Sequence, residues 1–496
     1  MSRKLPIFYS ALLLTGVNLL LRLVSTSFQV HISARLGPEG VGLLQLVMSV
    51  GALSLTAGMA GIRTATMYLT AEELGRKHPE NIRWVLRGCC TYSLICSSAV
   101  STLVWFSASW MATHWIGNPQ VVEAVRLFAL FLPIVCLSGC MTGYFTAANR
   151  IGTLAIVEIF EQLCYMAVTM GMLTFWAGHD PGKACQAVVL GSGVSACITL
   201  LCLAVLRLRE KAVSGPVIPV RKRLMQTAVP LALADDLKSG ITTCENLMVP
   251  KRLALYPGEE SPLAAFGVVC GMVFPVLMFP AAILFALAEL LIPELARCSA
   301  AGSRRRIEYL AKRCLKAALL YGCLCAGILF LIAKPLCLSL YDNSGAGELL
   351  RLYSCLIPVL YCDAMVDAMN KGLGQQKICV RYNILTAAMD VALLFLLLPS
   401  YGMQGYFFSF LVTHLINFIL SIRLLLRTAR IRIPFYIPAL TCSAALAAAC
   451  AADSIGSIPG RLAAFCALLG SLLTLFGIVS KKDVLWVKGL VGKRNT

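Results

Sequence analysis

The chain has 496 residues, of which 58% are hydrophobic and only 14% are charged. A soluble protein of this size needs a more polar surface, so the composition excludes most soluble classes and indicates a protein embedded in a lipid bilayer. The formal net charge of +19 would suggest nucleic-acid binding in a soluble domain, but basic residues also flank membrane spans. We therefore expect no nucleic-acid partner.

Apolar stretches long enough to cross ~30 Å of hydrocarbon recur along the whole chain. Because backbone amides in a bilayer must be satisfied within their own segment, each stretch is predicted to be a helix. The predicted fold class is all-α, a polytopic membrane protein with about 14 transmembrane helices. The predicted spans are 5–30, 41–70, 84–110, 121–147, 152–177, 184–208, 228–250, 264–297, 308–333, 349–373, 377–400, 402–427, 433–452 and 459–480.

The basic residues give the predicted orientation, since cytoplasmic loops of membrane proteins carry an excess of Lys and Arg. If the N-terminus is inside, most basic residues fall in cytoplasmic segments and seven fall on the opposite side. Both chain ends are then cytoplasmic, and residues 481–496 form a basic cytoplasmic tail. The first span is longer than a signal-peptide core, so we expect it to remain in the mature protein.

Two stretches resemble each other, one beginning at Leu36 and the other at Tyr256. Each joins a Pro/Gly/Glu turn to a long span, a basic loop and the start of the next helix. Because each repeat contains six spans, the two halves enter the membrane in the same orientation. We predict two pseudo-symmetric lobes, an N-terminal lobe at 1–210 (helices 1–6) and a C-terminal lobe at 225–430 (helices 7–12), followed by two extra helices within 431–480.

The chain lacks the short motifs on which many enzymes depend. It contains no GxxxxGK[ST] phosphate loop, no HExxH and no GxSxG, and no predicted loop exceeds about twenty residues. Its 22 cysteines lack the C-x-x-C spacing of zinc or redox sites, so we interpret them as small apolar packing residues. We predict that the protein is not an enzyme and that it has no cofactor and no metal site.

Ionisable residues inside the spans are the strongest indication of function. A charge at the bilayer centre costs about 2.5–3.5 kcal/mol on insertion scales, so such residues usually face a partner or a water-filled cavity. In the first half they are Arg22 and Arg63, with Glu158 and Glu161 spaced i, i+3 on one helix face. A guanidinium offers paired donors to phosphate oxygens and keeps its proton when desolvated, which favours an anion site. We predict that these four residues bind substrate; the alternative is that the arginines and glutamates form structural ion pairs.

The charges inside the spans of the second half are mostly acidic. Asp363 and Asp390 lie deepest, and we interpret them as ion-coupling candidates that would bind Na⁺ or a proton. Asp367 and Lys371 are spaced i, i+4 and are predicted to pair with each other. The other polar or charged members of this set are Asp235, Asp236, Glu245, Glu289, His414 and Asn417.

Three stretches resemble one known family. They are NLLLRL followed by ARLGPEGVGLLQL, NLMVPKRLA followed by GVVCGMVFPVLMFPAAILFALAELLIPELA, and KGLGQQKICVRYNIL. Together they resemble the multidrug/oligosaccharidyl-lipid/polysaccharide (MOP) flippase superfamily, most closely the polysaccharide-transporter branch of stage V sporulation protein B-like proteins and lipid II flippases. The resemblance covers nearly the whole chain.

The resemblance implies two six-helix lobes around a central cavity that alternates between inward-open and outward-open forms. It also implies a multi-pass protein of the bacterial cytoplasmic membrane that carries an undecaprenyl-linked glycan. In lipid II flippases an arginine on the first helix lines the cavity, and Arg22 stands at the matching position. Phe28 and Arg63 depart from the pattern of the relatives, so their detailed substrate contacts are not transferred to this chain.

The leading hypothesis is a flippase for a lipid-linked oligosaccharide or peptidoglycan precursor, which would serve wall, spore-cortex or surface-polysaccharide assembly. Its partners would be the cargo and the lipid bilayer, with Na⁺ or H⁺ as a candidate coupling ion, and a monomer would suffice. The alternative on the same scaffold is a multidrug and toxin extrusion-type cation antiporter, for which the acidic residues of the second half are suited. A polyprenyl-linked glycosyltransferase is disfavoured, because such enzymes usually carry a large domain outside the membrane.

Overall fold

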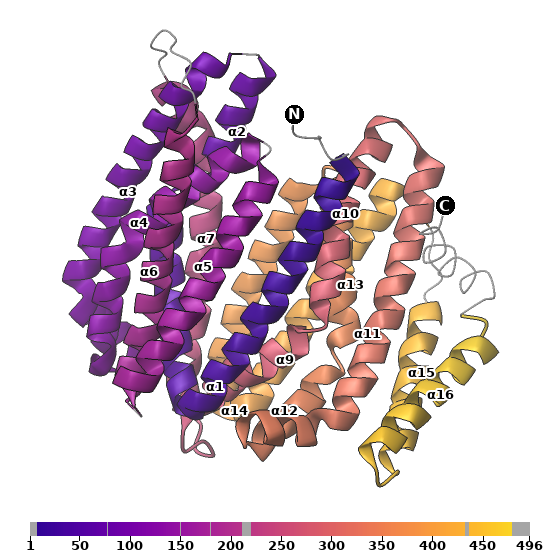
Figure 1. Ribbon diagram of the computed structural model, residues 1–496. Helices are drawn as coiled ribbons and strands as arrows, with labels where there is room; N and C mark the ends of the chain where they lie inside the picture. The colour runs from indigo at the N-terminus through magenta and orange to yellow at the C-terminus, as the bar shows by residue number, and fades with distance from the viewer. Residues whose placement is uncertain are drawn as a thin grey trace. The chain divides into compact units, whose positions relative to one another are not determined.

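The computed structural model describes residues 7–76, 78–148, 150–178, 180–210, 220–431 and 436–478. In these ranges the regular secondary structure is entirely helical, with no β-strand (Figure 1). The all-α prediction is thereby confirmed, and the physical reason is that helices satisfy their own backbone hydrogen bonds without water. The predicted basic tail, 481–496, lies outside the described residues.

The described helices form two compact units. The first contains the described residues up to Gly271 together with Asp390–Tyr406, and the second contains Met272–Met389 and the described residues from Phe407 onward. In the first unit α3, α4, α5 and α6 run side by side (Figure 1). The helices of the first unit are α1 (Ile7–Met59), α2 (Ile62–Gly75), α3 (Ile82–Trp110), α4 (Val122–Ala147), α5 (Ile151–Met172), α6 (Pro181–Leu208), α7 (Arg221–Leu253) and α8 (Pro262–Gly267).

The second unit is built around α11, which packs against α12, α13, α15 and α16. Helix α14 is long and contributes residues to both units. Short 3₁₀ or π segments continue several helices at Pro79–Asn81, Met111–Ile116, Pro119–Val121, Leu173–Ala177 and Val268–Val273. The remaining helices are α9 (Phe274–Met278), α10 (Ala281–Ala300), α11 (Arg304–Tyr341), α12 (Ser344–Ser354), α13 (Ile357–Gly372), α14 (Gln376–Ala429), α15 (Tyr436–Asp453) and α16 (Ile458–Leu475).

Nine helices in the described ranges are long and apolar enough to cross a membrane, or up to 11 if each of two bent helix pairs is one span. The first and second predicted spans are joined in α1 through Gly37, and the eleventh and twelfth are joined in α14 through Gly402. Both glycines adopt a positive φ, at which the chain turns without a side-chain penalty. Helix α7 contains the predicted span 228–250, but its many charged residues keep it out of this set of apolar helices. These features account for the difference from the 14 spans expected from sequence.

The boundary between the units differs from the boundary predicted between the lobes. Helices α7 and α8 were expected in the second lobe, but α7 packs against α1 and α2, and α8 packs against α1, within the first unit. Arg223 near the start of α7 explains part of this packing, because it forms ion pairs of 2.6 Å with both Glu72 and Glu73 of α2. The six-plus-six division of the sequence into lobes stays a prediction.

A break at Ala60 and Gly61 divides the predicted second span into the end of α1 and the whole of α2. Gly61 has a φ of +70°, and a Cβ at this position would lie 2.6 Å from the backbone oxygen of Ala228. Only glycine fits both the backbone angle and this close approach of α7. The break therefore reflects helix packing, and hydropathy alone could not predict it.

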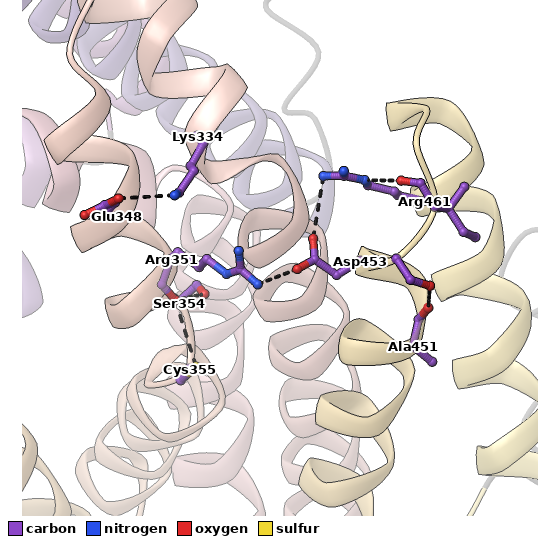
Figure 2. A network of polar contacts seen from close by, with 10 residues as sticks. Lys334, Glu348, Arg351, Ser354, Cys355, Ala451, Asp453 and Arg461 are labelled. Carbon is purple, nitrogen blue, oxygen red and sulfur yellow. Dashed lines mark hydrogen bonds and ion pairs between the residues drawn. The ribbon is translucent and has the colours of Figure 1, made fainter.

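The final helix pair is fixed to the second unit by polar and apolar contacts. Asp453 at the end of α15 accepts a 2.5 Å hydrogen bond from Arg351 of α12 and lies 3.5 Å from Nη1 of Arg461 on α16 (Figure 2). Phe465 of α16 is fully buried, and a Cβ on Gly327 of α11 would lie 2.0 Å from its ring. The predicted two extra helices thus form an integral part of this unit.

Candidate functional site

One face of α5 carries four polar or aromatic residues. Glu158, Glu161, Gln162 and Tyr165 follow one another at i, i+3, i+4 and i+7, a spacing that aligns side chains along one side of a helix. All four line the same cavity. This arrangement agrees with the prediction that the two glutamates share one helix face. Their spacing of three residues in the sequence is enough to place them there.

The cavity lies within the first unit and has a volume of about 500 Å³. This volume falls in the range of small-molecule sites, about 300–1,000 Å³. Helix α1 contributes Arg22 and Ser25, and α6 contributes Ser192 and Ser195, to walls that face the α5 residues. Helices α1, α5 and α6 all pack against one another, so the cavity is held by three mutually supported helices. The structure therefore brings Arg22, Glu158 and Glu161 together.

Among the described residues, the glutamates of this cavity form no ion pairs with the arginines. Within the described residues, neither Glu158 nor Glu161 lies within 4.0 Å of a basic side-chain nitrogen. Arg63 acts on both glutamates electrostatically from a greater distance, and it does not line the cavity. No ion pair between Arg63 and either glutamate is therefore present among the described residues, and the structural bridge considered from sequence stays an alternative prediction. Three of the four predicted substrate-binding residues share the cavity, and Arg63 is a charged neighbour.

Several cavity residues were missed by the sequence analysis. Gln162 lines the cavity, and its Nε2 is buried without a hydrogen-bond partner among the described residues. Tyr165 also lines it, and its ring packs edge to face with that of Phe28, with ring centroids 5.4 Å apart. Gln162 and Tyr165 lie four and seven residues after Glu158, and this helical spacing could have predicted that they share its face. Phe28, noted only as a departure from the relatives, thus orients a wall of the cavity.

The second unit contains a smaller cavity of about 230 Å³, lined by Asp363, Asp367, Asn383, His414 and Asn417 among other residues. Asn417 Nδ2 donates a 2.9 Å hydrogen bond to Asp363 Oδ2. The remaining oxygens of this pair, Asp363 Oδ1 and Asn417 Oδ1, are buried and have no hydrogen-bond partner among the described residues. Two buried acceptors in a small polar cavity are suited to a cation or to a proton donor.

Asp390, the other ion-coupling candidate, lies elsewhere. It is only 8% exposed, belongs to the first unit, and its carboxyl interacts with that of Glu245 on α7. The two candidates therefore have different surroundings. Asp363 faces a cavity with an amide partner, and Asp390 is packed against a second acid.

The remaining predictions concern an ion pair on α13, metal sites and the cysteines. Asp367 and Lys371 form the predicted ion pair at 2.6 Å. Across the described ranges, no group of three or more His, Cys, Asp or Glu residues has the arrangement of a metal site. All 22 cysteines are free thiols, and half-buried or buried positions predominate.

Comparisons with known proteins agree with this fold. The family model described as MatE matches residues 14–170. Stage V sporulation protein B of Bacillus subtilis (strain 168) is 22% identical over 412 residues, which cover 79% of this chain and 78% of that protein. The structure of the lipid II flippase MurJ has a TM-score of 0.67 at 12% identity and covers 94% of this chain and 98% of that chain. A multidrug resistance MATE family transporter of the MOP superfamily has a TM-score of 0.66 at 14% identity, with coverage of 84% and 97%.

These matches confirm the resemblance to the MOP superfamily that the sequence indicated. The structural matches show a shared fold, and the sequence relative extends the similarity well beyond the segment that the family model covers. The relatives named above are flippases or transporters where their names state an activity.

Proposed function

We infer that this chain is a flippase of the MOP type that moves an undecaprenyl-linked oligosaccharide or peptidoglycan precursor across the bacterial cytoplasmic membrane by alternating access. The observation that carries the proposal is Arg22 on the wall of a cavity of about 500 Å³ within the first unit. Arg22 lies within the first apolar stretch of the chain, where a charged side chain is costly and usually faces a partner or a water-filled cavity.

A guanidinium is chemically suited to a diphosphate. Its planar fork gives two parallel N–H donors to phosphate oxygens, and it stays charged in a low-dielectric site. Each hydrogen bond to a charged group contributes about 1.5–3 kcal/mol, so a bidentate contact accounts for a change of about 100-fold or more in affinity. Ser25 and Gln162 on the same cavity add neutral polar groups for the rest of the head group.

The test is transport by purified protein in liposomes that contain a fluorescent undecaprenyl-diphosphate-linked sugar. Arrival of the lipid in the opposite leaflet is followed with a membrane-impermeant quencher. Arg22→Ala should lower the flipping rate about 100-fold, and Arg22→Lys should retain part of it, because a lysine supplies charge without the fork. Normal flipping by both variants would contradict the proposal.

The matched control is Arg126→Ala. Arg126 also lies within a predicted span, but it pairs with Glu123 at 2.8 Å and does not line either described cavity. We expect flipping by this variant to stay within about twofold of the wild type, as for a paired charge on a helix surface. An equal loss in both variants would mean that the assay reports general damage to the fold.

The proposal includes an orientation and a coupling cation. Both chain ends are cytoplasmic in this proposal, because the basic residues of the sequence concentrate on that side. A Na⁺ or H⁺ gradient drives the cycle, with Asp363 or Asp390 as the residue that binds the cation. Reporter fusions to each terminus test the orientation, and a fusion that reports an external terminus would contradict it.

A cation antiporter of the multidrug and toxin extrusion kind is the second candidate. It is favoured by the carboxylates in both cavities, since such groups bind organic cations. Arg22 argues against it, because a fixed cation repels a cationic drug. The test is resistance of an expressing strain to cationic dyes. The antiporter would be favoured if expression increases resistance, ionophores abolish the increase, and the Arg22→Ala variant still gives it.

A further inference from the structure

The cavity of the first unit has an unequal supply of hydrogen-bond donors and acceptors. Its charged groups are one guanidinium, that of Arg22, and two carboxyl groups, those of Glu158 and Glu161. An ionised carboxylate only accepts hydrogen bonds, whereas a guanidinium only donates them. If Arg22 binds the diphosphate of the cargo, the adjacent wall on α5 presents mainly acceptors to whatever is attached to that diphosphate.

The acceptors of this wall are available for a ligand. Neither glutamate is in an ion pair with any basic side chain among the described residues. On the facing α6 wall, Ser195 donates its hydroxyl hydrogen to the backbone oxygen of Ser192 at 2.9 Å, so its oxygen adds an acceptor to the cavity. The buried Nε2 of Gln162 has no partner in the same set of residues and is the one amide donor on the α5 wall. The lining therefore suits a group with several donors and one carbonyl acceptor.

A sugar with hydroxyl, acetamido or amino groups fits this description. Its O–H and N–H groups can donate to the two carboxylates, and an acetamido carbonyl can accept from Gln162. A sugar that carries a free carboxylate does not fit, because it would bring a third negative charge next to Glu158 and Glu161 in a partly desolvated cavity. The carboxylates would then select against acidic sugars by repulsion.

We propose that Glu158 and Glu161 select the sugar attached to the diphosphate, admitting neutral and amino sugars and rejecting sugars with a free carboxylate. This inference rests on the proposed flippase function and adds the chemical class of the head group. Arg22 and the glutamate pair then have separate tasks, since the arginine binds the part common to all cargoes and the glutamates discriminate among sugars.

The experiment uses the full chain in liposomes with three fluorescent undecaprenyl-diphosphate-linked monosaccharides. One carries N-acetylglucosamine, one carries a sugar with a free amine, and one carries glucuronic acid. The wild type should flip the first two at least about tenfold faster than the glucuronic acid lipid, as repulsion between desolvated like charges requires. The double variant Glu158→Gln/Glu161→Gln should lower this ratio to about threefold or less, because the amides keep the shape and remove the charge.

Controls separate selectivity from a folding defect. The glutamines preserve side-chain volume, and continued flipping of the N-acetylglucosamine lipid by the double variant reports an intact fold. The single variants Glu158→Gln and Glu161→Gln are measured as well. They give the ratio of flipping rates between the N-acetylglucosamine and glucuronic acid lipids even if the double variant does not fold. Glu123→Gln is the matched control, since Glu123 pairs with Arg126 and its side chain is 59% exposed; its ratio should equal that of the wild type.

The outcomes distinguish the two proposals. Equal flipping of all three lipids by the wild type, or an unchanged ratio in the glutamine variants, would overturn the selectivity proposal and leave the flippase standing. Flipping of none of the three lipids by the wild type would overturn both.

Discussion

The two described cavities differ in charge and in size, and the difference suggests that one binds cargo and the other binds a cation. The cavity of the first unit has a volume of about 500 Å³ and combines Arg22 with two glutamates. The cavity of the second unit has a volume of about 230 Å³ and contains Asp363 and Asp367 with amides and a histidine, but no arginine or lysine lines it. A larger cavity of mixed charge suits an extended anionic cargo, and a small acidic one suits a cation or a few waters.

The partners of the acids reinforce this comparison. In the first cavity the glutamates are in no ion pair with described residues. In the second, Asp363 is oriented by Asn417 and Asp367 is paired with Lys371. Acids that are held in place while one oxygen remains buried without a partner form a pre-oriented site for a small ligand. The variants below test whether cargo recognition and ion coupling are indeed separate.

Among variants other than those of Arg22, the largest effect should come from Asp363→Asn in the second cavity. The amide keeps the contact with Asn417 by rotation but removes the charge that would bind a cation. We expect the stimulation of flipping by a Na⁺ or H⁺ gradient to fall about tenfold, whereas binding of undecaprenyl diphosphate should not change. The measurement is the flipping rate with and without an imposed gradient.

Asp390→Asn is the comparison for that variant. Asp390 interacts with the carboxyl group of Glu245 and does not line the second cavity. If ion coupling depends on the second cavity, the loss in Asp390→Asn should be smaller than the loss in Asp363→Asn. The reverse order would move the coupling site to the acid pair of the first unit.

A smaller effect is expected from Phe28→Leu beside the first cavity. Phe28 is buried and supports Tyr165 through an edge-to-face contact. Such contacts contribute about 0.5–1.5 kcal/mol beyond area burial, so the flipping rate should fall about threefold through looser placement of Tyr165. The gradient dependence should be unaffected, and an altered gradient dependence would show that the two cavities are not independent.

The smallest effect on transport should come from Asp453→Ala, which touches neither cavity. This change removes the partner of Arg351 and Arg461 that holds the last helix pair (Figure 2). Because these side chains are about one-third exposed, we expect a loss of only ~0.5–1 kcal/mol in stability. Thermal unfolding in detergent measures it, with Glu348→Ala, the exposed partner of Lys334, as the control. A large loss of flipping would give the final helices a role in transport.

The sequence predicted those features that depend on local spacing. The Asp367–Lys371 pair and the shared face of Glu158 and Glu161 follow from intervals of four and three residues, and the structure contains both. The long apolar stretches predicted the helices, because a helix satisfies its own backbone hydrogen bonds in lipid.

Features that depend on contacts between distant segments were not predictable in the same way. Asn417 lies 54 residues from Asp363, so no helical interval could have joined them. The break at Gly61 arises from the close approach of Ala228, and the pairing of Phe28 with Tyr165 arises from packing of α1 on α5. Arg63 was grouped with the cavity because it is a charge in a span, but its position just after that break removes it from the lining.

The most direct test of the account is the binding of undecaprenyl diphosphate, without any sugar, to the purified protein. Native mass spectrometry or quenching of intrinsic fluorescence gives the Kd for the wild type, Arg22→Ala and Glu158→Gln/Glu161→Gln. We predict that Arg22→Ala weakens binding about 100-fold, because a bidentate charge-assisted contact is lost, while the glutamine variant binds as well as the wild type. Equal affinity of the wild type and Arg22→Ala would contradict the claim that this arginine recognises the diphosphate of the cargo.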